Sequence, residues 1–267
     1  MDKEELNEHK VAEGVYGFRT AIANIAIVGG CGDSRDEWVI VDAGVPFSGP
    51  FIKRCAERVM GKGKKPIAIV LTHGHFDHVG GLKYLLNQWD IPVYAHKEEL
   101  PFLTGEKNYL PPDPSVGMGL MSLLSPLYPR KAINLGERVR ELPENGTIPE
   151  MPDWRYIHTP GHTQGHISLF RDTDKLIIVG DAFITVKQES ALAVLNQTKE
   201  IHGPPAYFTP DWETAEVSIR KLHALQPRIA LTGHGKPMAG SELTAGINKL
   251  VEEYDHIVVP KHGRYVH

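Results

Sequence analysis

Short apolar runs, each bounded by glycine, proline or charged residues, recur along most of this chain. Runs of this length, rich in valine and isoleucine, are typical of buried β-strands. Several are apolar at nearly every position, which indicates strands covered on both faces. The predicted strands are Ala21–Val28, Trp38–Val41, Ile67–Leu71, Val93–Ala95, Arg155–His158, Ile167–Phe170, Leu176–Val179 and Ile229–Leu231.

Segments with helical spacing of apolar residues lie between these strands. The first begins at Pro50, a residue that suits the first turn of a helix, and stops at Gly61. Another begins beside Asp211, where a carboxylate stabilises a helix N-terminus. Strands alternating with helices predict an α/β fold built in layers. The predicted helices are Pro50–Met60, Gly81–Gln88, Asp211–Leu225 and Ser241–Tyr254.

The alternation breaks between about residues 98 and 152, where prolines and glycines are frequent. Long irregular connections inside compact domains are usually functional. The apolar segment Leu120–Leu124 argues against a free linker. We therefore predict a lid or substrate-shaping insertion at 98–152, within a single domain that spans residues 1–267.

Composition narrows the class of protein. Hydrophobic residues make up 41% and charged residues 23% of the chain, which is ordinary for a globular enzyme. The formal net charge of -4 comes without any basic stretch, so no nucleic-acid partner is expected. Cys31 and Cys55 are too few for a disulfide framework. Because the N-terminus lacks an apolar signal core and no apolar run could span a membrane, we expect a cytoplasmic protein without membrane contact.

The most informative segment is Thr72-His73-Gly74-His75-Phe76-Asp77-His78, which follows the predicted strand Ile67–Leu71. It places three imidazoles and a carboxylate on one loop. Imidazole suits zinc, iron and similar metals, and a nearby carboxylate can bind a second ion. A polar loop without function would rarely hold these residues at such density.

Other predicted strands also end in histidine or aspartate. His162 follows Arg155–His158, Asp181 follows Leu176–Val179, and His234 follows Ile229–Leu231. Asp42 follows Trp38–Val41 in the same way. Each residue alone also fits an ordinary turn or a helix cap. Because strand ends meet at one rim of a layered α/β fold, we expect these side chains to assemble a single site.

The segment His73–His78, with Asp42 before it and His162, Asp181 and His234 after it, resembles the metallo-β-lactamase-fold superfamily. The motifs appear in the family's order and cover nearly the whole chain. The resemblance implies a four-layer αββα sandwich with a metal site at one edge.

The resemblance also implies roles for individual residues. A first metal ion would be held by His73, His75 and His162, and a second by Asp77, His78 and His234. Asp181 would bridge the two ions, and Asp42 would orient one of the ligating imidazoles. The implied cofactors are two divalent ions, with zinc expected and iron or manganese as alternatives.

The expected reaction is hydrolysis by a hydroxide that bridges the ions. Two divalent ions can lower the pKa of a shared water from about 15.7 to about 7, and they stabilise the developing oxyanion. Asp77 is the expected catalytic carboxylate, orienting the hydroxide and passing its proton to the leaving group. The expected substrate is an ester, thioester or lactone of a small molecule.

Several positions separate this chain from particular relatives. Flavodiiron-type proteins carry glutamate where this chain has His75, and true β-lactamases lack the bridging aspartate found here at Asp181. Quorum-signal lactonases carry tyrosine at the position of Ile184. Glyoxalase-II-like thioesterases share Thr159–Thr163, but their glutathione-binding basic residues have no clear counterpart. The RNA-processing branch carries an added domain, for which 267 residues leave little room.

Two other functions on the same fold stay open. One is a mononuclear-iron dioxygenase of the persulfide type, in which the site of Asp77, His78 and His234 would hold no ion. The other is a phosphodiesterase or nuclease, which the acidic balance disfavours. The assembly state is open as well, and a homo-oligomer is compatible with the sequence.

Residues outside the motifs give weaker indications. His166 lies four residues after His162 and is expected to pack beside the site rather than bind metal. His262 lies in a glycine-containing segment and could reach the site. The candidate substrate-binding residues are Phe102, Tyr109, Met118 and His202.

Overall fold

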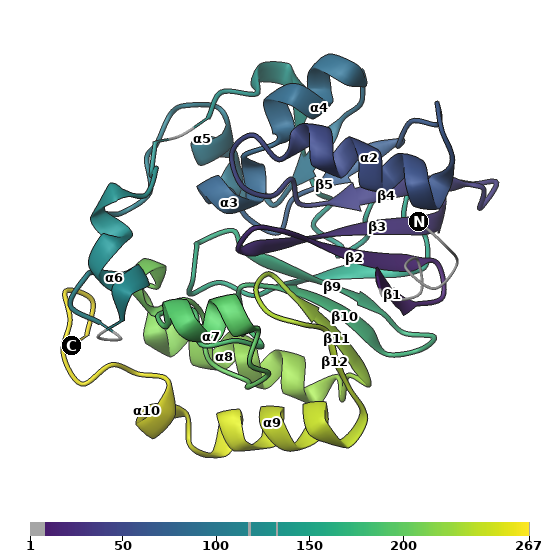
Figure 1. Ribbon diagram of the computed structural model, residues 1–267. Helices are drawn as coiled ribbons and strands as arrows, with labels where there is room; N and C mark the ends of the chain where they lie inside the picture. The colour runs from purple at the N-terminus through teal and green to yellow at the C-terminus, as the bar shows by residue number, and fades with distance from the viewer. Residues whose placement is uncertain (1–8, 117–118, 132, 267) are drawn as a thin grey trace.

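Two β-sheets form the centre of the molecule in a computed structural model that describes residues 9–116, 119–131 and 133–266 (Figure 1). The candidate residue Met118 lies outside the described residues. The seven-stranded sheet is antiparallel from β1 to β4 and parallel from β4 to β7. Its strands, in spatial order, are β1 (Lys10–Ala12), β2 (Val15–Thr20), β3 (Ala23–Cys31), β4 (Glu37–Val41), β5 (Ala68–Val70), β6 (Val93–Ala95) and β7 (Val139–Glu141).

The five-stranded sheet packs against the first. Its neighbouring strands are antiparallel except for the parallel pair β10 and β11. In spatial order they are β12 (Met238–Ala239), β11 (Ile229–Thr232), β10 (Leu176–Gly180), β9 (Ile167–Arg171) and β8 (Trp154–His158).

Helices cover the outer faces of both sheets. In Figure 1, α2 and α4 lie outside the first sheet, and α8 and α9 lie outside the second. The longer helices are α2 (Gly49–Met60), α4 (Leu82–Gln88), α8 (Trp212–Ala224) and α9 (Gly240–Glu252). The shorter ones are α3 (Phe76–Val79), η1 (Lys97–Glu99), α5 (Leu100–Leu103), α6 (Leu120–Leu124), η2 (Ser125–Leu127), η3 (Gly136–Arg138), α7 (Ala191–Asn196), η4 (Ala206–Phe208) and α10 (Tyr254–Ile257).

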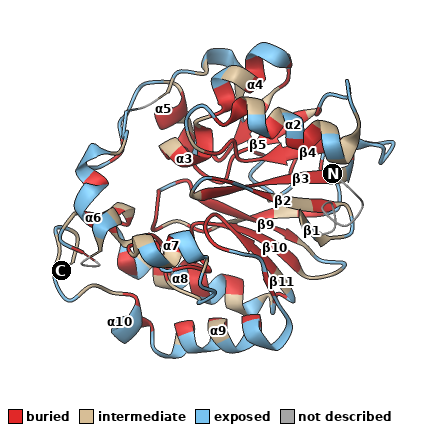
Figure 2. Cartoon of the chain, in the orientation of Figure 1, coloured by how far each residue is buried: buried red, intermediate tan, exposed pale blue. Residues whose placement is uncertain are grey.

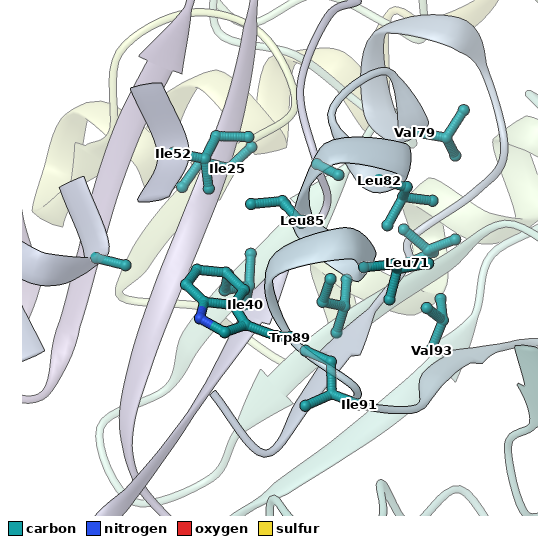
Figure 3. Close-up of a cluster of buried hydrophobic side chains, with 14 of the residues drawn as sticks. Ile25, Ile40, Ile52, Leu71, Val79, Leu82, Leu85, Trp89, Ile91 and Val93 are labelled. Atoms are coloured by element: carbon teal, nitrogen blue, oxygen red, sulfur yellow. The ribbon is translucent and has the colours of Figure 1, made fainter. Parts of the chain in front are cut away.

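The alternation of side chains along each strand builds the layers. On β4, Trp38 and Ile40 face the helices α2 and α4, where Figure 3 shows Ile40 among Ile25, Ile52 and Leu85. Val39 and Val41 point the other way and pack between the sheets. Figure 2 shows the sheets almost wholly buried, with exposed residues on the outer helices. The predicted αββα sandwich is therefore confirmed.

The predicted helices agree with the structure to within two residues at each end. Helix α2 has Pro50 in its first turn and ends at Gly61, whose positive φ of 104° suits glycine. At the start of α8, the Asp211 side chain accepts a hydrogen bond from the Thr214 N–H, as expected of an N-cap.

Some strands were missed by the sequence reasoning. Strand β2 pairs with β3 along its whole length, but Gly17 interrupts its apolar pattern and only Val15 and Phe18 are buried hydrophobics. Strands β1, β7 and β12 have three residues or fewer, which is too short for a recognisable alternation of apolar and polar residues. Strand β3 begins at Ala23, two residues after the predicted start at Ala21, because Ala21 has a positive φ of 61° and lies in a turn.

The segment 98–152 is less irregular than its composition predicts. Strand β7 completes the first sheet, and Leu142, Ile148 and Met151 are buried between the sheets. The apolar segment 120–124 forms α6, yet Leu120 and Leu123 are exposed. The lid function of this segment stays a prediction. No helix in the described part of the chain combines the length and apolar character needed to cross a membrane.

Candidate metal centre

The ends of five strands deliver the predicted residues to one rim between the two sheets. Asp42 follows β4, and the segment from Thr72 follows β5 and runs into α3. The other three strand ends, those of β8, β10 and β11, carry His162, Asp181 and His234. All of the predicted metal-binding side chains are buried, although each is polar. Buried polar groups need partners, so the contacts of each define the site.

Two groups of three side chains come together as the resemblance implies. His73, His75 and His162 each offer a ligand atom within 4.8 Å of the others. The same holds for the second group, which comprises Asp77, His78 and His234.

The Asp181 carboxylate lies between the two groups. Its Oδ2 is 3.9 Å from His73 Nε2 and 3.5 Å from His162 Nε2, both from the first group. The same oxygen is 3.6 Å from His78 Nε2 and 3.1 Å from His234 Nε2, both from the second. One carboxylate oxygen therefore faces four imidazole nitrogens, as a bridging ligand would.

Asp42 fixes the orientation of two of these imidazoles. His78 Nδ1 lies 2.7 Å from Asp42 Oδ2 and donates to it. The Thr72 hydroxyl donates to the same oxygen at 2.8 Å, so it accepts from His73 Nδ1 at 3.1 Å. In the neutral form of both rings the proton is then on Nδ1, and Nε2 carries the lone pair.

Hydrogen bonds with other segments fix the rings of His162 and His234 in the same tautomer, with the proton on Nδ1. The Thr209 hydroxyl donates to the Pro205 carbonyl and so accepts from His162 Nδ1, 3.1 Å away. His234 Nδ1 donates to the Ile22 carbonyl at 2.8 Å. In the neutral rings, four Nε2 lone pairs would thus face one carboxylate, and His234 Nε2 lies within hydrogen-bond distance, 3.1 Å, of Asp181 Oδ2. Protons on some of the rings, or cations between the nitrogens and the carboxylate, relieve the repulsion.

The pKa values reflect this crowding of imidazoles. Burial, followed by the neighbouring histidines, lowers the pKa of His73 and His162 well below the usual value. Burial also lowers the pKa of His75, to about 3. Neutral imidazoles with free lone pairs are the form that binds metals.

In the second group, nearby carboxylates raise the pKa values of the histidines. Burial lowers the pKa of His78, but Asp181 and Asp42 outweigh it and leave that pKa well above the usual value. At His234, Asp181 likewise outweighs burial and raises the pKa. Burial raises the pKa of Asp181, but His234 and His78 hold it well below its normal range. The site is therefore built to hold positive charge around an ionised Asp181.

Atoms without hydrogen-bond partners mark where that charge belongs. His73 Nε2, His78 Nε2 and Asp181 Oδ1 are buried and make no hydrogen bond. His75 Nδ1 lies 2.9 Å from His162 Nε2, a distance that one proton or one shared cation can hold. Imidazole nitrogens and carboxylate oxygens are the ligand types of zinc and iron sites, so these residues fit divalent metal ions.

Glycines let the backbone approach the site closely. A Cβ atom on Gly233 would lie 2.0 Å from Asp181 Oδ1, and one on Gly180 would lie 2.6 Å from His166 Nε2. A side chain at Gly233, the residue before His234, would therefore collide with Asp181.

His166 supports the site without facing it. Its Nε2 accepts the Asp181 backbone N–H at 2.8 Å, and its Nδ1 lies 2.8 Å from the Thr159 hydroxyl. Both ring nitrogens are therefore in use, and packing beside the site, as predicted, describes its position.

Replacing Asp42 by asparagine should weaken zinc binding about 10- to 100-fold, the usual effect of losing a partner that orients a ligand. Asp42 has a positive φ of 64°, which asparagine tolerates, so the backbone is preserved. Competition with a chromophoric chelator measures the affinity. The exposed Asp36 supplies the control variant Asp36→Asn, and equal affinities in the two variants would contradict the orienting role.

Glu99 belongs to the site, and the sequence reasoning missed it. Its carboxylate is fully buried and accepts the backbone N–H groups of Gly74 and Gly165, each at 3.0 Å. It also accepts the hydroxyls of Thr163 and Tyr109. Gly74 lies on the loop of His73 and His75, and Thr163 and Gly165 lie on the loop of His162, so Glu99 ties those loops together. No motif marks Glu99, because its partners are distant in sequence and two are backbone groups.

Replacing Glu99 by glutamine should lower the free energy of unfolding by about 2–4 kcal/mol, because an amide nitrogen cannot accept the hydrogen bonds that the carboxylate accepts. Urea denaturation measures the change. The adjacent Glu98 is exposed and gives the matched control Glu98→Gln. Equal unfolding midpoints for both variants would show that Glu99 does not clamp the loops.

The candidate substrate-binding residues fall in different places. Phe102 and Tyr109 line a cavity together with His75 and His162. His202 lines another cavity, together with residues such as Glu200 and Lys249, and its Nε2 lies 3.1 Å from Glu200 Oε2. His262 is exposed and lines neither cavity. The substrate-binding function of Phe102, Tyr109 and His202 stays a prediction.

Comparison with known proteins places this geometry in a family. The model of the metallo-beta-lactamase superfamily matches residues 22–234, a span that includes every predicted metal-binding residue. This chain belongs to the metallo-beta-lactamase superfamily. A probable metallo-hydrolase of Bacillus subtilis, YflN, is 46% identical over 93% of this chain and 94% of its own length. A second probable metallo-hydrolase from that organism, YybB, is 29% identical over 78% of this chain and 80% of its own.

Solved structures agree with this membership at the level of the fold. A metallo-beta-lactamase family protein of Thermus thermophilus, TTHA1429, superposes with a TM-score of 0.61 at 16% identity, covering 92% of this chain and 81% of that one. The family inferred from the motifs is therefore confirmed. The names of the bacterial relatives support a metallo-hydrolase within the metallo-beta-lactamase superfamily.

Proposed function

We propose that this protein is a dinuclear metal-dependent hydrolase, with zinc as the expected metal, that acts on an ester, thioester or lactone of a small molecule. One observation carries the proposal. Four imidazole Nε2 atoms, in rings whose Nδ1 atoms are held by hydrogen bonds, lie 3.1–3.9 Å from the single oxygen Asp181 Oδ2. Two cations would accept these nitrogen lone pairs and balance the charge of the carboxylate.

The residues divide between two ions in this proposal. His73, His75 and His162 would hold the first, Asp77, His78 and His234 the second, and Asp181 would bridge them. Both groups support the assignment, because each brings its ligand atoms within 4.8 Å of one another. When bound, divalent ions would supply Lewis-acid activation of water at neutral pH and stabilise negative charge on the substrate.

The protein's own residues perform the other tasks. Asp77 accepts the proton of the attacking water and passes it to the leaving group. Burial raises the pKa of this carboxyl, which favours proton uptake. Asp42 keeps His78 and, through Thr72, His73 in one tautomer, and thereby keeps their Nε2 lone pairs available.

A substrate panel tests the reaction class. The zinc-loaded protein is assayed on a carboxylic ester, a thioester, a lactone and bis-p-nitrophenyl phosphate. We expect turnover on at least one carbonyl substrate to exceed turnover on the phosphodiester. The opposite order would assign a phosphodiesterase on the same fold and contradict the proposal.

A further inference from the structure

An apolar cavity opens beside the first histidine group. It has a volume of about 360 Å³ and borders His75 and His162. That volume lies at the lower end of the range for small-molecule sites, about 300–1,000 Å³. The wall beyond the histidines is mostly apolar, built by Phe102, Tyr109, Leu110, Pro111, Phe208 and Tyr265.

Aromatic rings lead from the histidines into this cavity. The His75 ring centroid lies 4.5 Å from that of Tyr109 and 4.7 Å from that of Phe208. Phe102 stacks on Tyr109 with centroids 4.2 Å apart and ring planes 7° apart. A substrate group in the cavity would therefore contact ring surfaces directly next to the proposed first metal.

Both tyrosines present their rings rather than their hydroxyls. The Tyr109 hydroxyl donates to the buried carboxylate of Glu99. The Tyr265 hydroxyl donates to the Pro111 carbonyl at 2.6 Å. With these hydroxyl protons engaged within the protein, the walls offer a substrate apolar area more than hydrogen-bond donors.

Charge along the cavity points to an uncharged group. No carboxylate is among the described residues that line it, and Lys107, which is exposed, is the one lysine or arginine there. A cationic group would have no counterion in this cavity. A polyanionic group would find a single ammonium, whereas an apolar group gains from leaving water.

We propose that this cavity holds the apolar acyl group of a carboxylic ester or thioester, with the scissile carbonyl toward His75 and His162. This inference rests on the proposed function and names its substrate class. Hydrolysis breaks the acyl–oxygen or acyl–sulfur bond. Water supplies a hydroxyl to the acyl carbon and a proton to the alcohol or thiol, so no further reactant is needed. Burial of each added methylene is expected to raise kcat/KM about fourfold until the cavity is full.

The test compares p-nitrophenyl esters from acetyl to decanoyl on the zinc-loaded protein and on two variants. Leu110, an exposed residue that lines the cavity, is replaced by tryptophan to reduce its volume. Leu192, an exposed residue of α7 that does not line it, is replaced by tryptophan as the matched control. We expect kcat/KM to rise with chain length, and the octanoyl-to-acetyl ratio to fall about tenfold in Leu110→Trp but not in Leu192→Trp.

Calorimetric titration with octanoate, the product of the octanoyl ester, gives a readout that does not depend on turnover. Leu110→Trp should weaken octanoate binding, and Leu192→Trp should leave it unchanged. Ester hydrolysis without chain-length dependence, or equal octanoate affinity in the two variants, would overturn the acyl cavity while the hydrolase stands. No turnover on any ester, thioester or lactone would overturn the proposed function, and the inference with it.

Discussion

The variant Asp181→Asn is expected to lose high-affinity binding of the second metal ion and at least about 10²–10³-fold in kcat/KM. Its carboxylate oxygen faces four imidazole nitrogens at 3.1–3.9 Å, and its ionised form balances the charge of the site. Asparagine keeps the shape of the side chain but removes the negative charge. Elemental analysis and kinetics on the same preparation measure both losses.

Asp172→Asn provides the matched control for this change. Asp172 is an exposed aspartate whose carboxylate accepts hydrogen bonds from Arg155, a contact of little energetic weight at the surface. The control should bind metal and turn over substrate like the parent protein. If Asp181→Asn also kept its full metal content and activity, the bridging role would be refuted.

Asp77→Asn is expected to keep the fold and lower kcat about 10²–10⁴-fold, the usual contribution of a positioned proton carrier. Asp77 lies in α3, and its Oδ2 is 3.6 Å from His234 Nε2, at the second group rather than the first. The amide cannot take up the proton of the attacking water. Steady-state kinetics at saturating zinc measure the loss.

The dependence of this effect on pH separates proton transfer from metal loss. Burial raises the pKa of Asp77 in the metal-free protein. In the zinc-loaded protein, activity should fall as pH drops through the pKa of this carboxyl, where the carboxylate becomes protonated and can no longer accept a proton. Asp77→Asn should lack this acidic limb at equal zinc content. Full activity in the variant would remove Asp77 from the mechanism.

The sequence predicted that these side chains come together, because they are concentrated in short motifs at the ends of strands. His73, His75, Asp77 and His78 lie within six residues, and each remaining histidine or aspartate follows a strand whose apolar run is plain. Parallel and neighbouring strands end at one rim, so the pattern of strand ends was enough to bring distant residues together. The family match then confirmed the fold.

The parts that the sequence did not predict depend on long-range contacts. Glu99 meets Gly74 and Gly165 only in the folded chain, and its backbone partners leave no pattern in the sequence. The same holds for Thr209, which sets the tautomer of His162 across 47 positions. Strand β2 was missed because its stability comes from pairing with β3 rather than from its own apolar period.

Apolar composition did not settle burial in one segment. The apolar run 120–124 is no free linker, because it forms α6, yet Leu120 and Leu123 are exposed there, while the sheet strand β7 came from Val139, Arg140 and Glu141. The sequence shows that a residue is apolar, but only the fold decides whether another element covers it.

The metal content of the purified protein tests the central claim most directly. The protein is loaded with excess zinc or ferrous iron, dialysed and analysed by mass spectrometry, with Asp181→Asn alongside. The account predicts about two zinc ions per chain, fewer in the variant, and hydrolysis that disappears with chelation and returns with zinc. A single tightly bound iron per chain, with oxygen consumption in place of hydrolysis, would contradict it.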